Sequence, residues 1–106
     1  MNDRLGNLEE MVLMMVILVN NEAYGITVRE AYVKQYKQEI SLSAIHTVLR
    51  RLEQKGFLQS ELGGASTERG GRRKRLYQIT PYGYKKVSQN QEERSRIWAL
   101  IPKLDF

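Results

Sequence analysis

Apolar residues recur at steps of three and four along the first twenty positions of the chain. Leu5 and Leu8 begin this pattern, which predicts an amphipathic helix over about residues 5–20. Further apolar residues widen the stripe, so most of this helix is expected to be buried. The uninterrupted apolar run from Met11 to Val19 covers nine residues, which is too short to span a bilayer.

Two more helices are predicted in the next part of the chain. Thr27 is expected to cap the second helix, because Glu30 stands three residues later, as in a capping box. The third helix is expected to start at Leu42, with Ser41 as its N-cap, and to end before Gly56. Apolar residues at helical spacing give this third helix an inner face, and its opposite face is polar.

The residues that follow the third helix indicate a β-hairpin. Residues 57–62 and 75–80 have the pattern of two strands, joined by a glycine-rich loop over residues 63–74. Thr80 and Pro81 are residue types that begin a helix, as N-cap and as first helical residue. A last helix is therefore expected to reach about residue 101.

The order of helix, helix, helix, strand, strand and helix predicts the fold class. It is α+β but mostly α, a winged helix-turn-helix with an N-terminal helix and a C-terminal dimerisation helix. Two parts are expected, a winged helix-turn-helix DNA-binding domain over residues 1–80 and a dimerisation helix over residues 81–106.

Positive charge is concentrated in the middle of the chain. The whole sequence carries a net charge of +5, and residues 41–80 alone carry +5, with eight Lys or Arg and three Asp or Glu. Residues 1–40, at −2, and residues 81–106, at +2, cancel each other. A localised basic patch is typical of a surface that binds nucleic acid or an anionic membrane. On charge alone, a basic surface that only aids solubility is an equal alternative.

The composition excludes several kinds of chemistry. The chain has no cysteine and one histidine, so disulfides, metal centres and cysteine nucleophiles are not expected. The carboxylates are scattered, and no serine has a recognisable histidine–carboxylate partnership, so we expect neither an enzyme nor a cofactor. The first residues lack the features of a signal peptide, and a cytoplasmic location without membrane attachment is expected.

The polar face of the third helix carries the residues expected to contact DNA. Short side chains near its start allow close approach of the helix N-terminus, and its cationic end suits phosphates. Hydroxyl, imidazole and guanidinium groups can read base edges in the major groove. The candidate residues are Ser41, Ser43, Ala44, His46, Thr47, Arg50 and Arg51. For a single helix, an ordinary solvated face would be the default interpretation, and for His46 plain exposure stays as favoured as a DNA contact.

The loop of the hairpin carries the sequence R-G-G-R-R-K-R, which ends at Arg75. Burying unpaired cations is too costly, so this loop must reach into solvent, where it can bind a polyanion. Arg73 and Arg75 are expected on one face of the strand and Lys74 on the other, because side chains alternate. The candidate phosphate contacts of this wing are Arg72, Arg73, Lys74 and Arg75.

The last helix has a polar middle and an apolar end. Residues 88–96 contain no apolar residue, and the apolar segment with Trp98 follows. We expect the polar part to cross solvent and the apolar end to be buried by a second copy of the chain. The alternative is a helix that folds back on its own domain. The candidate residues for a dimer interface or a ligand pocket are Leu5, Leu8, Val87, Ile97, Trp98 and Ile101.

A set of short motifs over roughly residues 5–85 resembles the PadR family of bacterial transcriptional regulators. The matching residues are Leu5-Gly6 with Leu8-Glu9, Tyr24-Gly25, Ile40-Ser41, Leu49-Arg50-Arg51-Leu52-Glu53 with Gly56, and Gly71-Arg72 with Tyr77-Gln78-Ile79-Thr80 and Gly83. The ordered set, which ends in G-R-x-x-x-x-Y-x-I-T-x-x-G, carries the resemblance.

The resemblance implies a homodimer that binds palindromic operators in double-stranded DNA, often as a repressor released by a small-molecule effector. It places the recognition helix at residues 41–51 and the wing at residues 71–77. The chain departs from the family at Leu42, Ser43 and His46, where proline, glycine and an aromatic residue are common. These departures concern the base preference and some phosphate contacts rather than the fold.

The short C-terminal region resembles a compact PadR subgroup with a single terminal helix. Some members of that subgroup bind flat aromatic drugs between tryptophans of the dimer interface, so Trp98 is a candidate for contact with an aromatic effector. The favoured function is a sequence-specific transcriptional regulator, a repressor. Two alternatives stay open: a multidrug-type ligand sensor with a pocket around Trp98, and a winged helix used for protein–protein binding.

Overall fold

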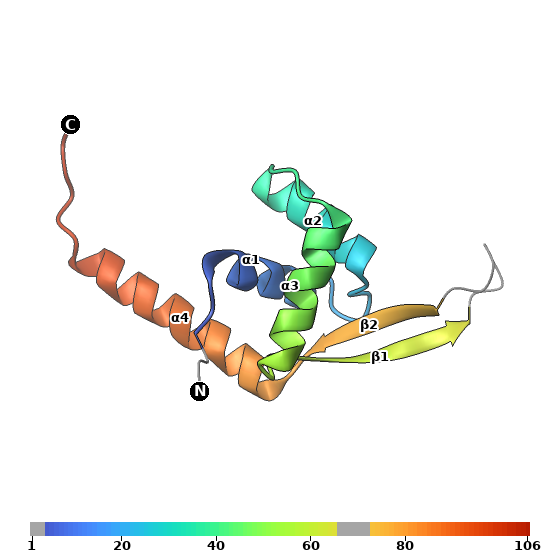
Figure 1. The fold of residues 1–106 in the computed structure, drawn as a ribbon. Helices are drawn as coiled ribbons and strands as arrows, with labels where there is room; N and C mark the ends of the chain where they lie inside the picture. Colours follow the sequence, from blue (N-terminus) through green and yellow to red (C-terminus); the bar gives the residue numbers. More distant parts are fainter. Residues whose placement is uncertain (1–3, 66–72) are drawn as a thin grey trace.

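A computed structural model describes residues 4–65 and 73–106 of the chain (Figure 1). Its elements are α1 (Asn7–Leu18), α2 (Gly25–Tyr36), α3 (Leu42–Gln54), β1 (Leu58–Ala65), β2 (Arg73–Ile79) and α4 (Pro81–Leu100). The predicted order of helices and strands is confirmed. Helices α1 to α3 form the body, the β1–β2 hairpin extends from one side of it, and α4 extends from the other (Figure 1).

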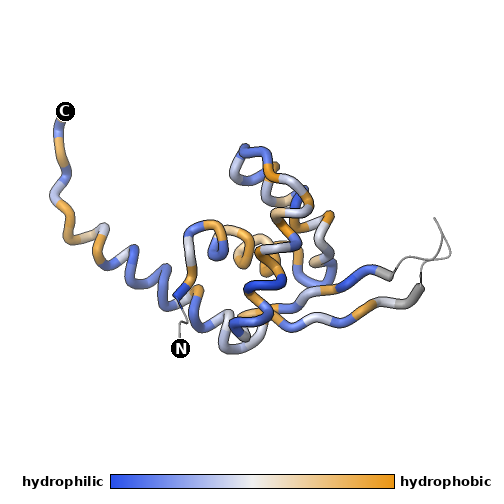
Figure 2. The backbone as a smooth tube through the Cα atoms, viewed as in Figure 1, coloured by the Kyte–Doolittle hydropathy of each residue, from blue (hydrophilic) through white to orange (hydrophobic). Residues whose placement is uncertain are grey.

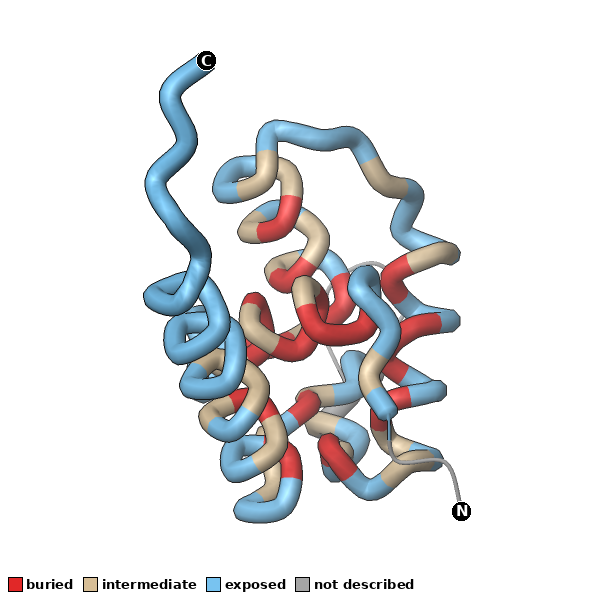
Figure 3. Tube along the Cα trace, turned by 90° about the vertical axis from the view of Figure 1, so that its left-hand side faces the viewer, coloured by how far each residue is buried: buried red, intermediate tan, exposed pale blue. Residues whose placement is uncertain are grey.

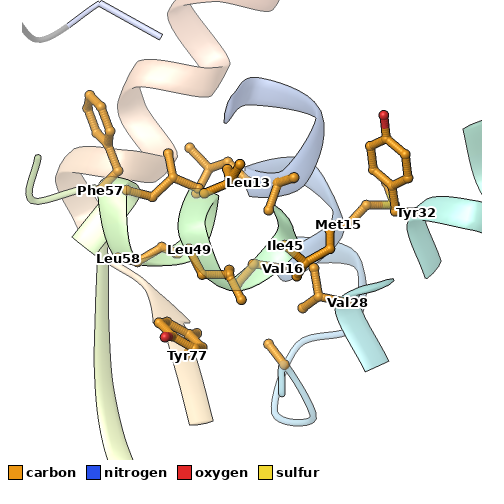
Figure 4. Close-up of a cluster of buried hydrophobic side chains, with 14 of the residues drawn as sticks. Leu13, Met15, Val16, Val28, Tyr32, Ile45, Leu49, Phe57, Leu58 and Tyr77 are labelled. Atoms are coloured by element: carbon orange, nitrogen blue, oxygen red, sulfur yellow. The ribbon is translucent and has the colours of Figure 1, made fainter. Parts of the chain in front are cut away.

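The hydrophobic core lies between the first three helices and the base of the hairpin (Figure 4). Each large apolar side chain that is fully buried contributes about 1.5–3 kcal/mol. Those with the least exposure are Phe57, Leu13, Ile45, Leu49, Leu52, Val12 and Val28. Because three of them come from α3, the core fixes the rotation of that helix and leaves its polar face in solvent.

The start of α2 differs from the prediction. Tyr24 is the N-cap, and Thr27 lies at the third position of the helix. The Thr27 hydroxyl oxygen accepts a hydrogen bond from the backbone N–H of Tyr24 at 2.9 Å, and the hydroxyl donates to the carbonyl of Glu22. Thr27 therefore binds back to the turn that precedes the helix. The predicted capping box of Thr27 and Glu30 was wrong.

The predicted caps of α3 and α4 are confirmed. The Ser41 hydroxyl accepts from the backbone N–H of Ala44 at 3.1 Å, and the Thr80 hydroxyl accepts from the N–H of Gly83 at 3.0 Å. Gly56 follows α3 with φ at +83°, a left-handed conformation that glycine adopts without a steric penalty. Both ends of α3 are therefore set by local residues.

The strands of the hairpin differ from the predicted bounds. Strand β1 starts at Leu58 and both strands extend into residues 63–74, which were predicted as loop. The strands pair antiparallel from Leu58 and Ile79 onward, with a register shift between Leu62 and Ala65. We call this hairpin, whose described strands cover residues 58–65 and 73–79, the wing.

The wing is fastened at its base to the turn between α1 and α2. The backbone N–H of Tyr77 in β2 donates to the carbonyl of Ala23 at 2.9 Å. Tyr77 is also buried in the core, and Ala23 is 1% exposed. The base of the wing is thus part of the body.

Helix α4 leaves the body at a close backbone contact. A Cβ atom at Gly83 would lie 2.2 Å from the carbonyl oxygen of Phe57, so only glycine allows this approach. The ring of Tyr82 stacks on that of Phe57, with centroids 5.1 Å apart. Val87 joins the core at 8% exposure. From residue 92 to the end, every residue is exposed (Figure 3). We call residues 92–106 the arm.

Candidate nucleic-acid interface

The exposed face of α3 is formed by hydroxyl and guanidinium side chains. Ile45, Val48, Leu49 and Leu52 point into the core, and the residues between them are left outside. Those that the sequence singled out and that are exposed here are Ser41, Ser43, His46, Thr47, Arg50 and Arg51, whereas Ala44 is half-buried. Leu42 stands at helical spacing with Ile45 and Leu49 and was therefore expected on the inner face, but it is 39% exposed.

The Thr47 hydroxyl has a defined orientation. It donates its proton to the carbonyl oxygen of Ser43, one turn earlier in α3, at 3.0 Å. The lone pairs of the Thr47 oxygen are therefore directed outward as acceptors. Acceptors of this kind match the exocyclic amino groups of adenine and cytosine in the major groove.

His46 is exposed, but its imidazole ring lies against the start of α2. A Cβ atom at Gly25, the first residue of α2, would lie 2.4 Å from Cε1 of His46. The imidazole thus rests on the backbone of Gly25, which fixes its direction at the junction of the two helices. The sequence showed Tyr24-Gly25 only as a turn, and nothing local in it connects Gly25 to a residue 21 positions later.

The wing is connected to α3 by a chain of hydrogen bonds. Nη1 of Arg75 donates to the Ser60 hydroxyl at 3.0 Å, and this hydroxyl donates to Oε2 of Glu53 at 2.7 Å. Arg75 therefore links β2 to α3 through β1, and its exposed guanidinium retains further N–H donors. Burial raises the pKa of the Tyr77 phenol, and the negative charge of the same Glu53 carboxylate raises it further.

The structure describes the other cations near Arg75 to different extents. Nζ of Lys74 lies 5.6 Å from the ring centroid of Tyr24, which is a cation–π distance. Arg73 is the first residue of β2, and only its backbone is described. Arg72 lies outside the described residues.

Glu9 and Lys55 tie α1 to the C-terminal end of α3. Nζ of Lys55 lies 2.9 Å from Oε1 of Glu9, which also accepts from the backbone N–H of Gly6 at 2.7 Å. Burial alone would raise the pKa of Glu9, but these hydrogen bonds and the positive charges of Lys55 and Arg51 outweigh burial and hold it below its usual value. The charged carboxylate thus holds the two helices together.

The polar middle of α4 was predicted to cross solvent, and for its first turns this was wrong. Asn90 and Arg94 both bind the carboxylate of Glu10 in α1, and Nε2 of Gln91 lies 3.9 Å from Sδ of Met14. The buried carboxylate of Glu10 therefore binds the polar segment of α4 to α1.

The apolar residues of the arm have no cover within the described part of the chain. Trp98 is 73% exposed, and Ile97 and Ile101 are 46% exposed. Figure 2 shows this apolar segment beyond the hydrophilic middle of α4. The other candidates of this group lie elsewhere: Leu8 is exposed on α1, Leu5 is half-buried against the core, and Val87 is inside the core.

Two further properties concern the described residues alone. Within residues 4–65 and 73–106, no three His, Cys, Asp or Glu side chains are grouped so that they could hold a metal ion. No helix in these same ranges combines the length and the apolar character that a membrane crossing requires.

Three helices followed by a two-stranded wing, with the polar face of α3 exposed beside that wing, define a winged helix-turn-helix protein. The model of the transcriptional regulator PadR-like family matches residues 13–89, and the chain belongs to this family. It is a family of transcriptional regulators, which is not a class of enzymes. Among curated protein sequences, none matches this chain.

Solved structures share the fold at low sequence identity. A transcriptional regulator from Clostridium thermocellum is 22% identical with a TM-score of 0.67, over 88% of this chain and 84% of that one. A PadR-like transcriptional regulator from Bacillus cereus is 20% identical with a TM-score of 0.68, over 88% and 85%. Bacillus subtilis PadR, crystallised in complex with operator DNA, is 20% identical with a TM-score of 0.62, over 94% of this chain and 50% of that one.

Proposed function

We propose that this chain is a homodimeric, sequence-specific DNA-binding regulator that acts in the cytoplasm and represses transcription from a palindromic operator. The observation that carries the proposal is the exposed face of α3, which places hydroxyl, imidazole and guanidinium groups beside a wing that is hydrogen-bonded to the same helix. The structure of a PadR protein with operator DNA supports it as a relative of the same fold.

Within this proposal, the two halves of the α3 face have different tasks. Ser43, His46 and Thr47 face the base edges, because they lie on the N-terminal half of the helix, which enters the major groove most deeply. Arg50 and Arg51, on the C-terminal half, hold phosphates. Each well-made contact to a base contributes about 1–3 kcal/mol of discrimination.

The wing supplies sequence-independent affinity. The sequence of the hairpin carries four consecutive cations, Arg72, Arg73, Lys74 and Arg75, and such runs of cations bind phosphates with release of counterions. Arg75 has a second task, because its bond to Ser60 joins the wing to the recognition helix. Because the wing is fixed relative to α3 in this way, both elements contact the DNA together.

The test of this proposal is the salt dependence of binding. The double substitution Arg72→Ala/Arg73→Ala is expected to weaken binding to any duplex. It should also reduce the slope of log affinity against log salt by about 3.6, since the dimer loses two contacts in each protomer and each phosphate contact contributes about 0.9. Lys85→Ala/Arg96→Ala removes the same charge from α4 and should leave the slope unchanged. Equal slopes for the wild type and the wing variant would rule out the wing as a phosphate contact and favour the protein-binding alternative.

A second candidate function follows from a hollow of about 550 Å³ at the end of the arm. Its lining is mostly apolar, which suits a planar aromatic compound, and consists of Trp98, Ile101, Pro102, Lys103, Leu104 and Phe106. Trp98 is the single tryptophan of the chain, so tryptophan fluorescence reports on the surroundings of this one side chain. Quenching by planar aromatic compounds would support an effector site, and no quenching across a broad panel would count against it.

A further inference from the structure

The contact between α4 and the body beyond Val87 is polar. The last apolar anchor of α4 is Val87, and beyond it Asn90, Gln91 and Arg94 reach the body. Asn90 and Arg94 lie one helical turn apart. Both bind the carboxylate of Glu10: Nδ2 of Asn90 donates to Oε2 at 2.8 Å, and Arg94 pairs with Oε1. Among the described residues, Arg94 is therefore the last residue of α4 that binds the body, and the rest of the arm, residues 95–106, projects beyond it.

Glu10 is buried deeply enough for these contacts to matter. It is 3% exposed, in a helix whose neighbouring side chains form the core. A buried carboxylate that loses its partners keeps the full cost of its removal from water. Orientations of α4 that separate Asn90 and Arg94 from Glu10 are therefore unfavourable. These contacts thus fix the direction of the helix relative to the body.

The direction of α4 determines where two bodies stand relative to each other when their arms pair. Helix α4 has 20 residues and is therefore about 30 Å long. A rotation of about 10° at its root moves its far end by about 5 Å. One base pair moves a half-site by about 3.4 Å and turns it by about 35°. A small change in the direction of α4 thus displaces the far end of the helix by at least as much as one base pair displaces a half-site.

We propose that Glu10, acting through Asn90 and Arg94, is a positioning residue that sets the half-site spacing which the dimer accepts. The inference rests on the proposed dimeric DNA-binding function. It adds that α1, and not the arm alone, selects the geometry of the operator. Replacing Glu10 should leave the sequence of each half-site unchanged, because no atom of α3 is altered.

The first experiment measures the geometry of the dimer without DNA. The chain has no cysteine, so Lys34→Cys on the exposed side of α2 gives one spin-label site per protomer. Pulsed dipolar spectroscopy of the full-length dimer should give a narrow distance distribution. Combined with Glu10→Gln or Arg94→Met, the distribution should broaden or shift. A narrow distribution at the same distance in both variants would overturn the inference.

Arg96→Met is the matched control, because it removes the same charge from α4 at an exposed position outside the contact with Glu10. Its distance distribution should equal that of the wild type. Thermal unfolding of every variant shows whether the fold is retained. Because Arg94 is largely exposed, Arg94→Met keeps the test valid if Glu10→Gln fails to fold.

The second experiment measures the spacing on DNA. The wild type and the two variants each select duplexes from the same random pool. All are expected to select the same half-site. The wild type should accept one spacing and lose roughly tenfold in affinity when one base pair is added or removed, the scale of one mismatched base pair. The variants should lose less than about threefold.

The outcomes separate the two claims. If the variants keep one spacing with a tenfold loss, Glu10 does not set the spacing, although the proposed function stands. If the wild type selects no duplex or sediments as a monomer, the proposed function fails and the inference fails with it.

Discussion

Trp98→Asp tests whether the arm is buried in a dimer. Trp98 is 73% exposed in one chain, and the described part of that chain contains nothing that covers it. Asp removes the indole and places a carboxylate where the partner's apolar surface would lie. The substitution lies beyond the body of its own protomer, so the fold of the monomer should be unaffected.

The expected effect can be calculated from the exposed area. A tryptophan has about 250 Å² of surface, so a residue 73% exposed has about 180 Å² to bury. At about 25 cal/mol per Å², its burial contributes about 4.5 kcal/mol, and a two-fold dimer contains two such residues. Even one third of this total, about 3 kcal/mol, raises the dimer dissociation constant more than a hundredfold.

Sedimentation velocity at micromolar concentration measures this effect. The wild type should sediment as a dimer and Trp98→Asp as a monomer, with the same thermal unfolding of the body. Leu62→Asp, which alters an apolar residue of the wing that is 50% exposed, should remain a dimer. A Trp98→Asp protein that sediments as an intact dimer would refute the role of the arm.

Two further predictions concern the packing of the body. Gly25→Ala places a methyl group 2.4 Å from Cε1 of His46, so the exposed imidazole must move, and the free energy of unfolding should fall by about 0.5–1.5 kcal/mol. Adding His46→Ala should restore most of the loss in urea titrations, and no restoration would show that His46 is not the obstacle. Glu9→Gln should cost about 1.5–3 kcal/mol at pH 7, because Lys55 and Gly6 donate to a charged carboxylate. Since the pKa of Glu9 is lowered on folding, its stabilisation is complete above the usual value of 4.5 and is lost as the pH falls through the lower folded value. Urea titrations from pH 7 to pH 3 should therefore show a loss in the wild type that is weaker in Glu9→Gln, and parallel losses would contradict this cause.

The parts of the fold that follow from local residues were predictable from the sequence. Ser41 and Thr80 cap their helices through N–H groups only three residues away, so their residue types and positions were sufficient. The inner and outer faces of α3 followed from the spacing of its apolar residues. The prediction for Thr27 was wrong for an equally local reason. Its hydroxyl can hydrogen-bond to the residues that follow it or to those that precede it, and in the structure it accepts from Tyr24.

The contacts that the sequence did not reveal join residues far apart in the chain. Glu10 and Arg94 lie 84 positions apart, and each was seen only as a charged residue on its own helix. The Gly25–His46 contact likewise depends on the angle between α2 and α3. The wing strands were predicted too short because Gly63, Gly64 and Ala65 show no alternation, and the pairing of Ala65 with Arg73 depends on the partner strand.

The central claim is that two copies of this chain bind one duplex, each through the exposed face of its α3. Selection of bound sequences from a random duplex pool by the full-length protein tests this claim most directly. The account predicts an inverted repeat, with half-sites one helical turn or a multiple of it apart, about 34–36 Å or multiples of this distance. Enrichment of a single unrepeated site, or of no sequence at all, would contradict it.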